Sequence, residues 1–493
     1  MLRILLSLGI LVTGCFALPC GAEDGSSSRT VIRLKVSPAK APKPALRYRL
    51  LPELPELSPG NPIQGYLKAI LPHQKLVRNQ KPGSVVRGRI LAMPLELSPR
   101  EGPREYGRLV LAEVDRAARL DRPDWQILPR MRTDGYSLLL PDVQELRGLA
   151  NSLKARFHAE VAAGQGEEAL RTAKTMLAMG QHLGEHPSII GNLVGIAITN
   201  LTIAPLEEWI TQPSCPNLYW ALTSLPSPLI SLTAGTEGER WMMHSELQGI
   251  REQEPMSADQ IKEFASHWDR VFGNSNATGE QQRLHAWLHE QINDHQRVAA
   301  TRRNLVKQGL PRAQLDRFSA AQVILLDGKL KSLARFDEFA KQARLPFWQI
   351  HALDSQAQNQ STDPGDKSKI VRDAIPNLVP ARRAQARLDQ RIALLRHVEA
   401  LRLHAAEHQG NLPDQLSEIT VPLPNDPMSG KPFIYKRNEK SALLHGSAPR
   451  GEEANPHFNI QVEITLSAED PSAQSDSPSR PSSEQKAEGG LSR

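Results

Sequence analysis

The sequence predicts a mainly α-helical protein of stacked, solenoid-like helical hairpins, with a small C-terminal α+β module of about three antiparallel strands. Apolar residues recur at spacings of three and four through residues 141–225, the period of amphipathic helices. Aromatic residues make up only 5% of the 493 residues, which disfavours an all-β fold. Near the C-terminus the period changes to two, because Ile460, Val462 and Ile464 alternate with polar residues.

Length and charge limit the classes that the chain can belong to. A chain of 493 residues is too long for one core and predicts about two or three domains. The 60 basic and 54 acidic residues are interleaved, so the formal net charge of +6 indicates a mixed, solvated surface. Nucleic-acid-binding proteins typically carry a basic block with interleaved aromatics, and this sequence has none, so we expect no nucleic-acid partner.

Residues 1–22 have the pattern of a signal peptide. Arg3 precedes an apolar run over 4–12 that is too short to span a bilayer. Two processing routes fit the sequence: the tetrad VTGC resembles a bacterial lipobox, in which Cys15 would be acylated, and the alternative is cleavage after Ala22. We therefore expect an exported protein that is either periplasmic or held at the membrane by a lipid anchor.

Removal of residues 1–22 would leave Cys215 as the only thiol, because the other two cysteines lie at 15 and 20. An intramolecular disulfide and a zinc site built on cysteines are then excluded. The mature protein is expected to depend on packing alone.

The polar, proline-rich leader is expected over residues 23–45, and within it 30–36 alternate as a short strand. The helical domain should follow over residues 46–380. Its breaks are predicted at 164–166 and at His186-Pro187. The predicted helices, in order, begin after Asn61 and cover 109–120, the hairpins of 141–225, 236–253, 257–272, 279–308, and a last helix from the N-cap Ser319 to before Pro346.

The α+β module is expected over residues 381–466. A helix over 384–408 should end at Gly410, which stands where a C-cap glycine would. A hairpin and a third strand follow, and we expect the strands near 432–437, 442–445 and 458–466. Residues 467–493 are rich in serine and poor in apolar side chains, which predicts a disordered tail.

Several short motifs are spread over residues 47–456. They are YRLLP at 48–52, PGN at 59–61, DRAAR at 115–119 followed by DW at 124–125, LLP at 139–141, and PNLYWAL at 216–222 followed by LP at 225–226. In these motifs the chain resembles a group of exported, uncharacterised proteins that is expanded in planctomycete-type bacteria. The resemblance implies export and a helical architecture, and it implies no particular activity.

A second set of motifs lies within residues 392–449: GNLP at 410–413, LP at 423–424, DP at 426–427, GKPF at 430–433, and Tyr435. This segment is similar to the C-terminal half of type II secretion pseudopilins, which implies a helix packed on a small antiparallel sheet. The pseudopilin's hydrophobic N-terminal helix is missing, so pilus assembly is not implied. Some modules of this kind bind calcium, but Asn425 and Asp426 alone are too few for an ion that needs six or more oxygen ligands.

Candidate chemistry is sparse. His285 and His289 lie four residues apart, a spacing that can chelate a metal, and Glu290 follows directly. The motif HExxH is not completed, because residue 293 is Asn, so we interpret these residues as a polar helix face. His404 and His408 repeat the spacing at a helix end. Five aromatic residues are expected to be core anchors rather than the lining of a ligand groove: Trp125, Tyr219, Trp220, Trp241 and Trp287.

These observations favour a non-enzymatic, exported helical scaffold or binding protein of the cell envelope. We expect it to engage an envelope protein or peptide through the concave face of its stacked helices, without a cofactor or catalytic residues. One alternative is a metal-dependent envelope hydrolase that uses His285, His289 and Glu290. Another is an accessory component of a secretion-related assembly, which the pseudopilin-like module suggests.

Overall fold

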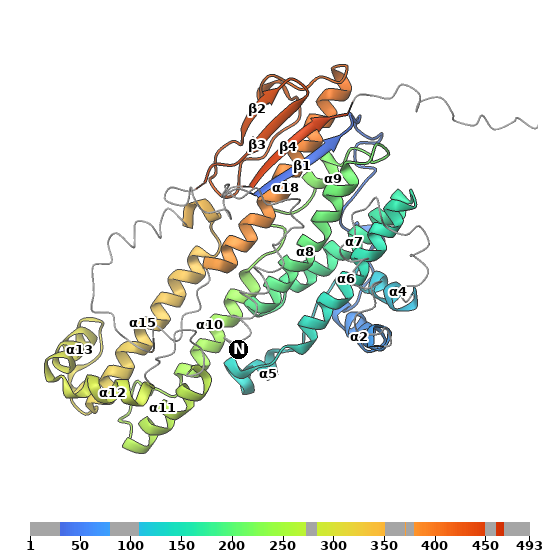
Figure 1. Ribbon diagram of the computed structural model, residues 1–493. Coiled ribbons are helices and arrows are strands. Elements are labelled where there is room, and N and C mark those ends of the chain that lie inside the picture. The colour runs from blue at the N-terminus through green and yellow to red at the C-terminus, as the bar shows by residue number, and fades with distance from the viewer. Residues whose placement is uncertain are drawn as a thin grey trace, which may run out of the picture.

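The structure is a computed structural model, and it describes residues 30–78, 108–272, 283–350, 370, 379–448 and 460–467. These residues form mainly helices, with one four-stranded sheet at one end of the molecule (Figure 1). The predicted mainly helical fold with a small C-terminal sheet is therefore confirmed. The predicted signal peptide with Cys15, and the predicted tail beyond Ser467, lie outside the described residues.

Three consecutive helices make the centre of the helical body: α6 (Pro141–Ala162), α7 (Gly166–Gly184) and α8 (Ile189–Ile210). The chain turns between them at both predicted breaks. All three pack against one another, so they close into a bundle rather than an open superhelix. A Cβ atom on Gly195 of α8 would lie 2.7 Å from the backbone oxygen of Gly180 on α7, and only glycine allows this approach. Helices α2 (Pro62–Arg78) and α4 (Arg108–Ala117) pack together, and α2 also packs on α6.

Helix α8 is the single helix in the described ranges that is long and apolar enough to cross a membrane. Of its most apolar stretch, 72% is buried inside the protein. Because it contacts α6, α7, α10 and α18, its composition fits a central core helix.

A second apolar core lies at the end of the molecule opposite the sheet, where Trp268 and Phe336 are almost fully buried (Figure 1). The predicted single helix over 279–308 is wrong. The chain breaks at Asp294, whose carboxylate accepts a hydrogen bond from the Arg297 amide at 3.0 Å and so starts a new helix. The helices of this region are α10 (Thr233–Leu247), α11 (Ala258–Phe272), α12 (Leu284–Asn293), α13 (His295–Lys307), α14 (Arg312–Leu315) and α15 (Ala320–Gln342). Ser319 caps α15 as predicted.

Short elements connect these helices. They are α5 (Leu128–Asp134), α9 (Tyr219–Thr223), and the 3-10 turns η1 (Leu54–Glu56), η4 (Gly135–Ser137) and η5 (Leu416–Glu418).

The sheet has the order β1-β4-β3-β2. Strands β2 (Ile434–Asn438), β3 (Ser441–His445) and β4 (Ile460–Leu466) are antiparallel neighbours, as predicted. The fourth strand, β1 (Thr30–Val36), comes from the expected leader and pairs in parallel with β4, with Thr30 opposite Ile460. The predicted strand in the leader therefore exists, but the leader is not separate from the fold, because β1 completes the C-terminal sheet.

Helix α18 (Val379–Glu407) joins the two expected domains (Figure 1). One core cluster contains residues from β1, from α6 to α9, from α18 and from β3 and β4. The expected division near residue 381 thus does not separate two cores. The helix ends as the glycine predicts: Gln409 and Gly410 have φ of 56° and 79°, and the Gly410 amide donates to the Ala405 carbonyl at 2.8 Å.

Candidate functional site

The histidines of the predicted metal site lie on the solvent side of α12. His285, His289 and Glu290 are exposed, whereas Trp287 and Leu288 turn into the core. The nearest polar contact of the His289 ring is the Asn293 side chain at 3.4 Å, one helical turn away. Among the described residues no group of three or more His, Cys, Asp or Glu side chains is arranged to hold a metal ion.

The second histidine pair is stacked. The rings of His404 and His408 lie 3.8 Å apart with an interplanar angle of 9°. Nδ1 of His408 lies 2.8 Å from the His404 carbonyl, so it donates its proton there. The pair is therefore part of the C-terminal end of α18, and one of its four ring nitrogens is occupied by this hydrogen bond to the backbone.

Asp426, the candidate calcium ligand, points into the protein. Asp426 is fully buried, and its carboxylate accepts hydrogen bonds from Gln390 Nε2 at 2.9 Å, the Met428 amide at 3.0 Å and the Ser429 hydroxyl at 3.2 Å. Burial raises its pKa, although these donors act against the rise. The side chain thus fastens the loop before β2 to α18, and its oxygens are directed at protein donors.

The aromatic residues singled out in the sequence lie mostly in the interior. Tyr219 and Trp287 are buried, and Trp125 donates from Nε1 to the His182 carbonyl at 3.1 Å. Trp241 is 37% exposed, and the Arg132 guanidinium lies over its ring. Trp287 belongs to the second apolar core, whereas Trp125 packs against two other clusters, so these two side chains do not share one groove.

Cys215 is also structural. It is 2% exposed, and burial raises the pKa of its thiol. Its backbone carbonyl accepts a hydrogen bond from Arg402 at 2.9 Å. The thiol is therefore protonated and shielded at neutral pH.

A densely connected polar site is formed by an ion pair on α18 between Glu399 and Arg402, whose side chains are both 0% exposed. Arg402 NH1 lies 2.7 Å from Glu399 Oε1. The guanidinium also donates to the backbone carbonyls of Ser37 and Cys215, each at 2.9 Å. One side chain thus holds the segment after β1 and the turn before α9 on α18.

Glu399 completes this arrangement, which we call the α18 junction and define by Ser37, Cys215, Asn217, Glu399 and Arg402. Oε2 of Glu399 accepts from the Leu218 amide at 2.9 Å, and its backbone carbonyl accepts from Asn217 Nδ2 at 2.9 Å. Burial raises the pKa of Glu399, and the neighbouring Arg402 opposes the rise. The PNLYWAL motif therefore lies at a buried contact between three distant parts of the chain.

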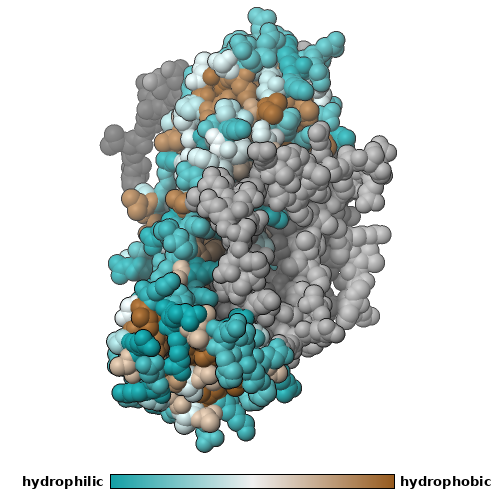
Figure 2. Space-filling model, turned by 90° about the vertical axis from the view of Figure 1, so that its left-hand side faces the viewer, coloured by the Kyte–Doolittle hydropathy of each residue, from teal (hydrophilic) through white to brown (hydrophobic). Residues whose placement is uncertain are grey.

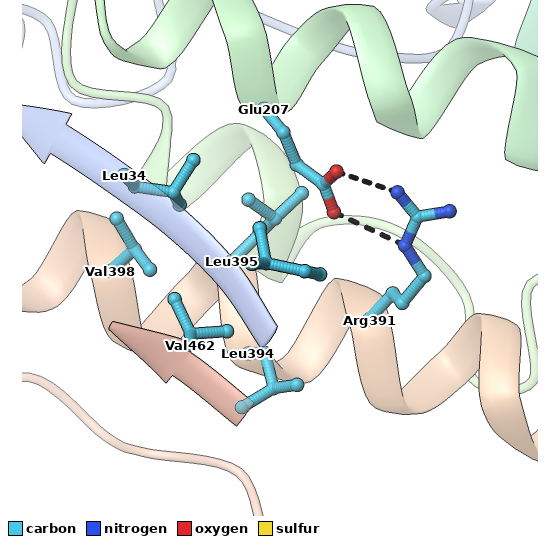
Figure 3. A pocket seen from close by; sticks show the side chains of 8 residues that line it. Leu34, Glu207, Arg391, Leu394, Leu395, Val398 and Val462 are labelled. Atoms are coloured by element: carbon cyan, nitrogen blue, oxygen red, sulfur yellow. Dashed lines mark hydrogen bonds and ion pairs between the residues drawn. The ribbon is translucent and has the colours of Figure 1, made fainter. Parts of the chain in front are cut away.

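A second buried pair lies two turns earlier on α18. Arg391 donates from Nε and NH2 to the two oxygens of Glu207 on α8, at 3.1 and 2.6 Å (Figure 3). The pair borders a crevice between α8, α18, β1 and β4 that has no room for a water molecule. Its other lining residues are apolar: Ile32, Leu34, Leu394, Leu395, Val398 and Val462. The crevice is a packing seam, and the ion pair joins the two long helices across it.

The DRAAR motif forms a third polar network. The Asp115 carboxylate binds the Arg156 guanidinium through two hydrogen bonds, of 2.9 and 2.7 Å, and accepts from the Thr175 hydroxyl at 2.8 Å. Thr172 extends the network to Glu160 at 2.6 Å, and burial raises the pKa of Glu160 to about 7. The motif thus ties α4 to α6 and α7.

Sequence reasoning missed the charged residues of α18. One signal for them was present: between Ile392 and Leu403 buried apolar residues fall on several sides of the helix, and Glu399 and Arg402 lie among them. The partners of Arg402, by contrast, are distant in the chain: Cys215 lies 187 positions before it and Ser37 lies 365 positions before it.

Comparisons of the chain with protein-family models, with curated proteins and with solved structures found no match. The resemblances to exported planctomycete-type proteins and to pseudopilins therefore stay predictions from sequence motifs.

Proposed function

We propose that this chain is a non-catalytic, exported scaffold of the cell envelope, which holds its C-terminal α+β module in a fixed orientation for a protein partner. The observation that carries the proposal is the α18 junction, where buried charges serve to position distant segments. A buried ion pair adds little net stability, because desolvation offsets its Coulomb energy, but its directional bonds fix one arrangement.

Two further contacts support a rigid connection between body and module. The Arg391–Glu207 pair joins α18 to α8, and the Asp426 carboxylate joins α18 to the loop before β2. Both lie on the same helix as the junction. A helix that is fixed along its length at several points transmits the position of the body to the sheet with little freedom to rotate.

The hydrolase alternative has less support. His285, His289 and Glu290 are all on the solvent side of one helix, and in the described ranges no group of three or more His, Cys, Asp or Glu side chains could hold a metal ion. The secretion-related alternative has one supporting observation, which is that α18 packs on three antiparallel strands, as the pseudopilin resemblance implies.

Metal analysis separates the scaffold from the hydrolase. We expect the purified mature protein to contain no stoichiometric zinc after dialysis and to hydrolyse no generic ester or peptide substrate. His289→Ala should then change neither metal content nor thermal unfolding. Stoichiometric zinc together with a hydrolysis that His289→Ala abolishes would overturn the scaffold proposal.

The scaffold itself is tested by site-specific photocrosslinking in the envelope. A photoreactive residue at exposed Lys436 on the module should give a discrete adduct with another envelope protein, whereas the same residue at exposed His285 should not. Deletion of the whole module is unsuitable, because its strands share a core with the helical body. Equal, diffuse labelling from both positions would contradict a dedicated partner surface on the module.

A further inference from the structure

Strand β2 is an open edge of the sheet. It pairs with β3 on one side, and among the described strands none lies on its other side. Asn438 lies opposite Ser441 across a two-residue turn, so alternate residues of β2 direct their backbone groups to β3. The backbone groups of Tyr435 and Arg437 therefore point outward, and within the described part of the chain nothing bonds to them.

The side chains of β2 are divided between two faces. Tyr435 and Arg437 turn toward the segment after α18, where the Tyr435 hydroxyl donates to the Pro413 carbonyl at 2.8 Å and Arg437 pairs with Asp414. Ile434 and Lys436 lie on the opposite face, where Ile434 is 40% exposed and Lys436 is also exposed. The outer face of this edge thus presents one apolar and one basic side chain, two residues apart.

The edge is basic. Residues 431–440 (KPFIYKRNEK) contain three lysines and one arginine against a single glutamate. Figure 2 shows the surface on this side of the molecule, where apolar residues gather among hydrophilic ones over its upper part, the region of the sheet in Figure 1. Pairing of β2 with β2 of a second copy would bring lysine and arginine side chains together, which disfavours self-association.

We propose that the β2 edge binds an extended, acidic segment of a partner protein by strand addition. The outward backbone groups of Tyr435 and Arg437 would supply the hydrogen bonds. An acidic side chain beside Lys436 and an apolar one beside Ile434 would supply selectivity. This inference rests on the proposed scaffold function and names the class of partner that the module would bind.

The test uses the full mature protein and a fluorescein-labelled ten-residue peptide in which every second residue is threonine and the positions between alternate valine with glutamate, so that valine and glutamate share one face of the strand. Fluorescence anisotropy should show saturable binding, and a peptide with lysine in place of glutamate should bind much more weakly. Lys436→Glu should weaken binding of the acidic peptide by roughly fivefold to tenfold. Arg437→Pro should also weaken it, because proline removes an outward N–H group while the hydrogen bonds to β3 remain.

Lys35→Glu is the matched control, because Lys35 is exposed on β1 at the far edge of the same sheet. It makes the same change of charge and should leave binding unchanged, and circular dichroism should show that every variant is folded. Equal binding by all variants, or no binding at about 1 mM peptide, would overturn the strand-addition proposal while leaving the scaffold function standing. Concentration-dependent dimerisation that Lys436→Glu strengthens would overturn it too, because the edge would then pair with its own copy.

Discussion

Arg402→Met is expected to destabilise the protein strongly. Methionine fills a similar space but cannot donate a hydrogen bond. Glu399 would lose its guanidinium partner, and the carbonyls of Ser37 and Cys215 would lose their donors. Since Glu399, Arg402 and Cys215 are buried, water cannot replace the bonds lost between them.

The magnitude follows from the burial of both partners. Removing one member of a buried ion pair costs about 3–5 kcal/mol, because a charge is left without compensation. A typical domain is stable by about 5–15 kcal/mol, so a large fraction of the free energy of unfolding would be lost. The double variant Arg402→Met/Glu399→Leu leaves no buried charge and should recover part of the loss.

Urea unfolding followed by circular dichroism measures these differences as shifts of the midpoint at constant slope. Arg33→Met is the matched control, because the Arg33–Glu463 pair is 72% and 45% exposed. Exposed pairs contribute about 0–1 kcal/mol, so this variant should stay close to the wild type. A loss below about 1 kcal/mol for Arg402→Met, or a double variant as unstable as the sum of its single changes, would refute the reasoning.

Three further outcomes are expected. Burial raises the pKa of Glu239 to about 7 from 4.5, so its contribution to stability is complete below pH 4.5 and is lost as the pH rises through 7. Glu239→Gln should remove about 3 kcal/mol of this pH dependence of the free energy of unfolding, measured in urea. An unchanged pH profile would contradict the raised pKa of Glu239. Asp426→Asn should lower the free energy of unfolding by about 1–3 kcal/mol, while calcium should leave the melting temperature of the wild type unchanged; a calcium-dependent rise would mean that the loop binds the ion. Cys215 should react with a thiol reagent only as the protein unfolds, and rapid labelling in the absence of urea would show that the α18 junction is open.

Much of the local structure could be predicted from the sequence. The breaks at 164–166 and at His186-Pro187, the cap at Ser319 and the alternation of β4 all follow from residues close together in the chain. The break that divides residues 279–308 into two helices was missed. Asp294 acts as a cap only where the chain turns, and the residues on both sides of it have the sequence pattern of one continuous helix.

The candidate site was less predictable. The histidine spacing on α12 suggested a metal site, but spacing alone does not say whether a third ligand arrives from elsewhere. The same limit applies to Asp426, whose loop motif is readable in the sequence but whose inward orientation depends on Gln390 of α18. Side-chain direction is decided by the packing of whole elements against one another.

The sequence by itself determined most of the helices, the strands and their order along the chain, because these depend on local periodicity and on capping residues. Only the tertiary structure decided that the segment of β1 returns to pair with β4, 430 positions later, and that Arg402 reaches both Ser37 and Cys215. The physical reason is that a strand or a buried charge can be satisfied by many partners. Which partner it meets is set by the joint packing of all the helices, and no short stretch of sequence contains that information.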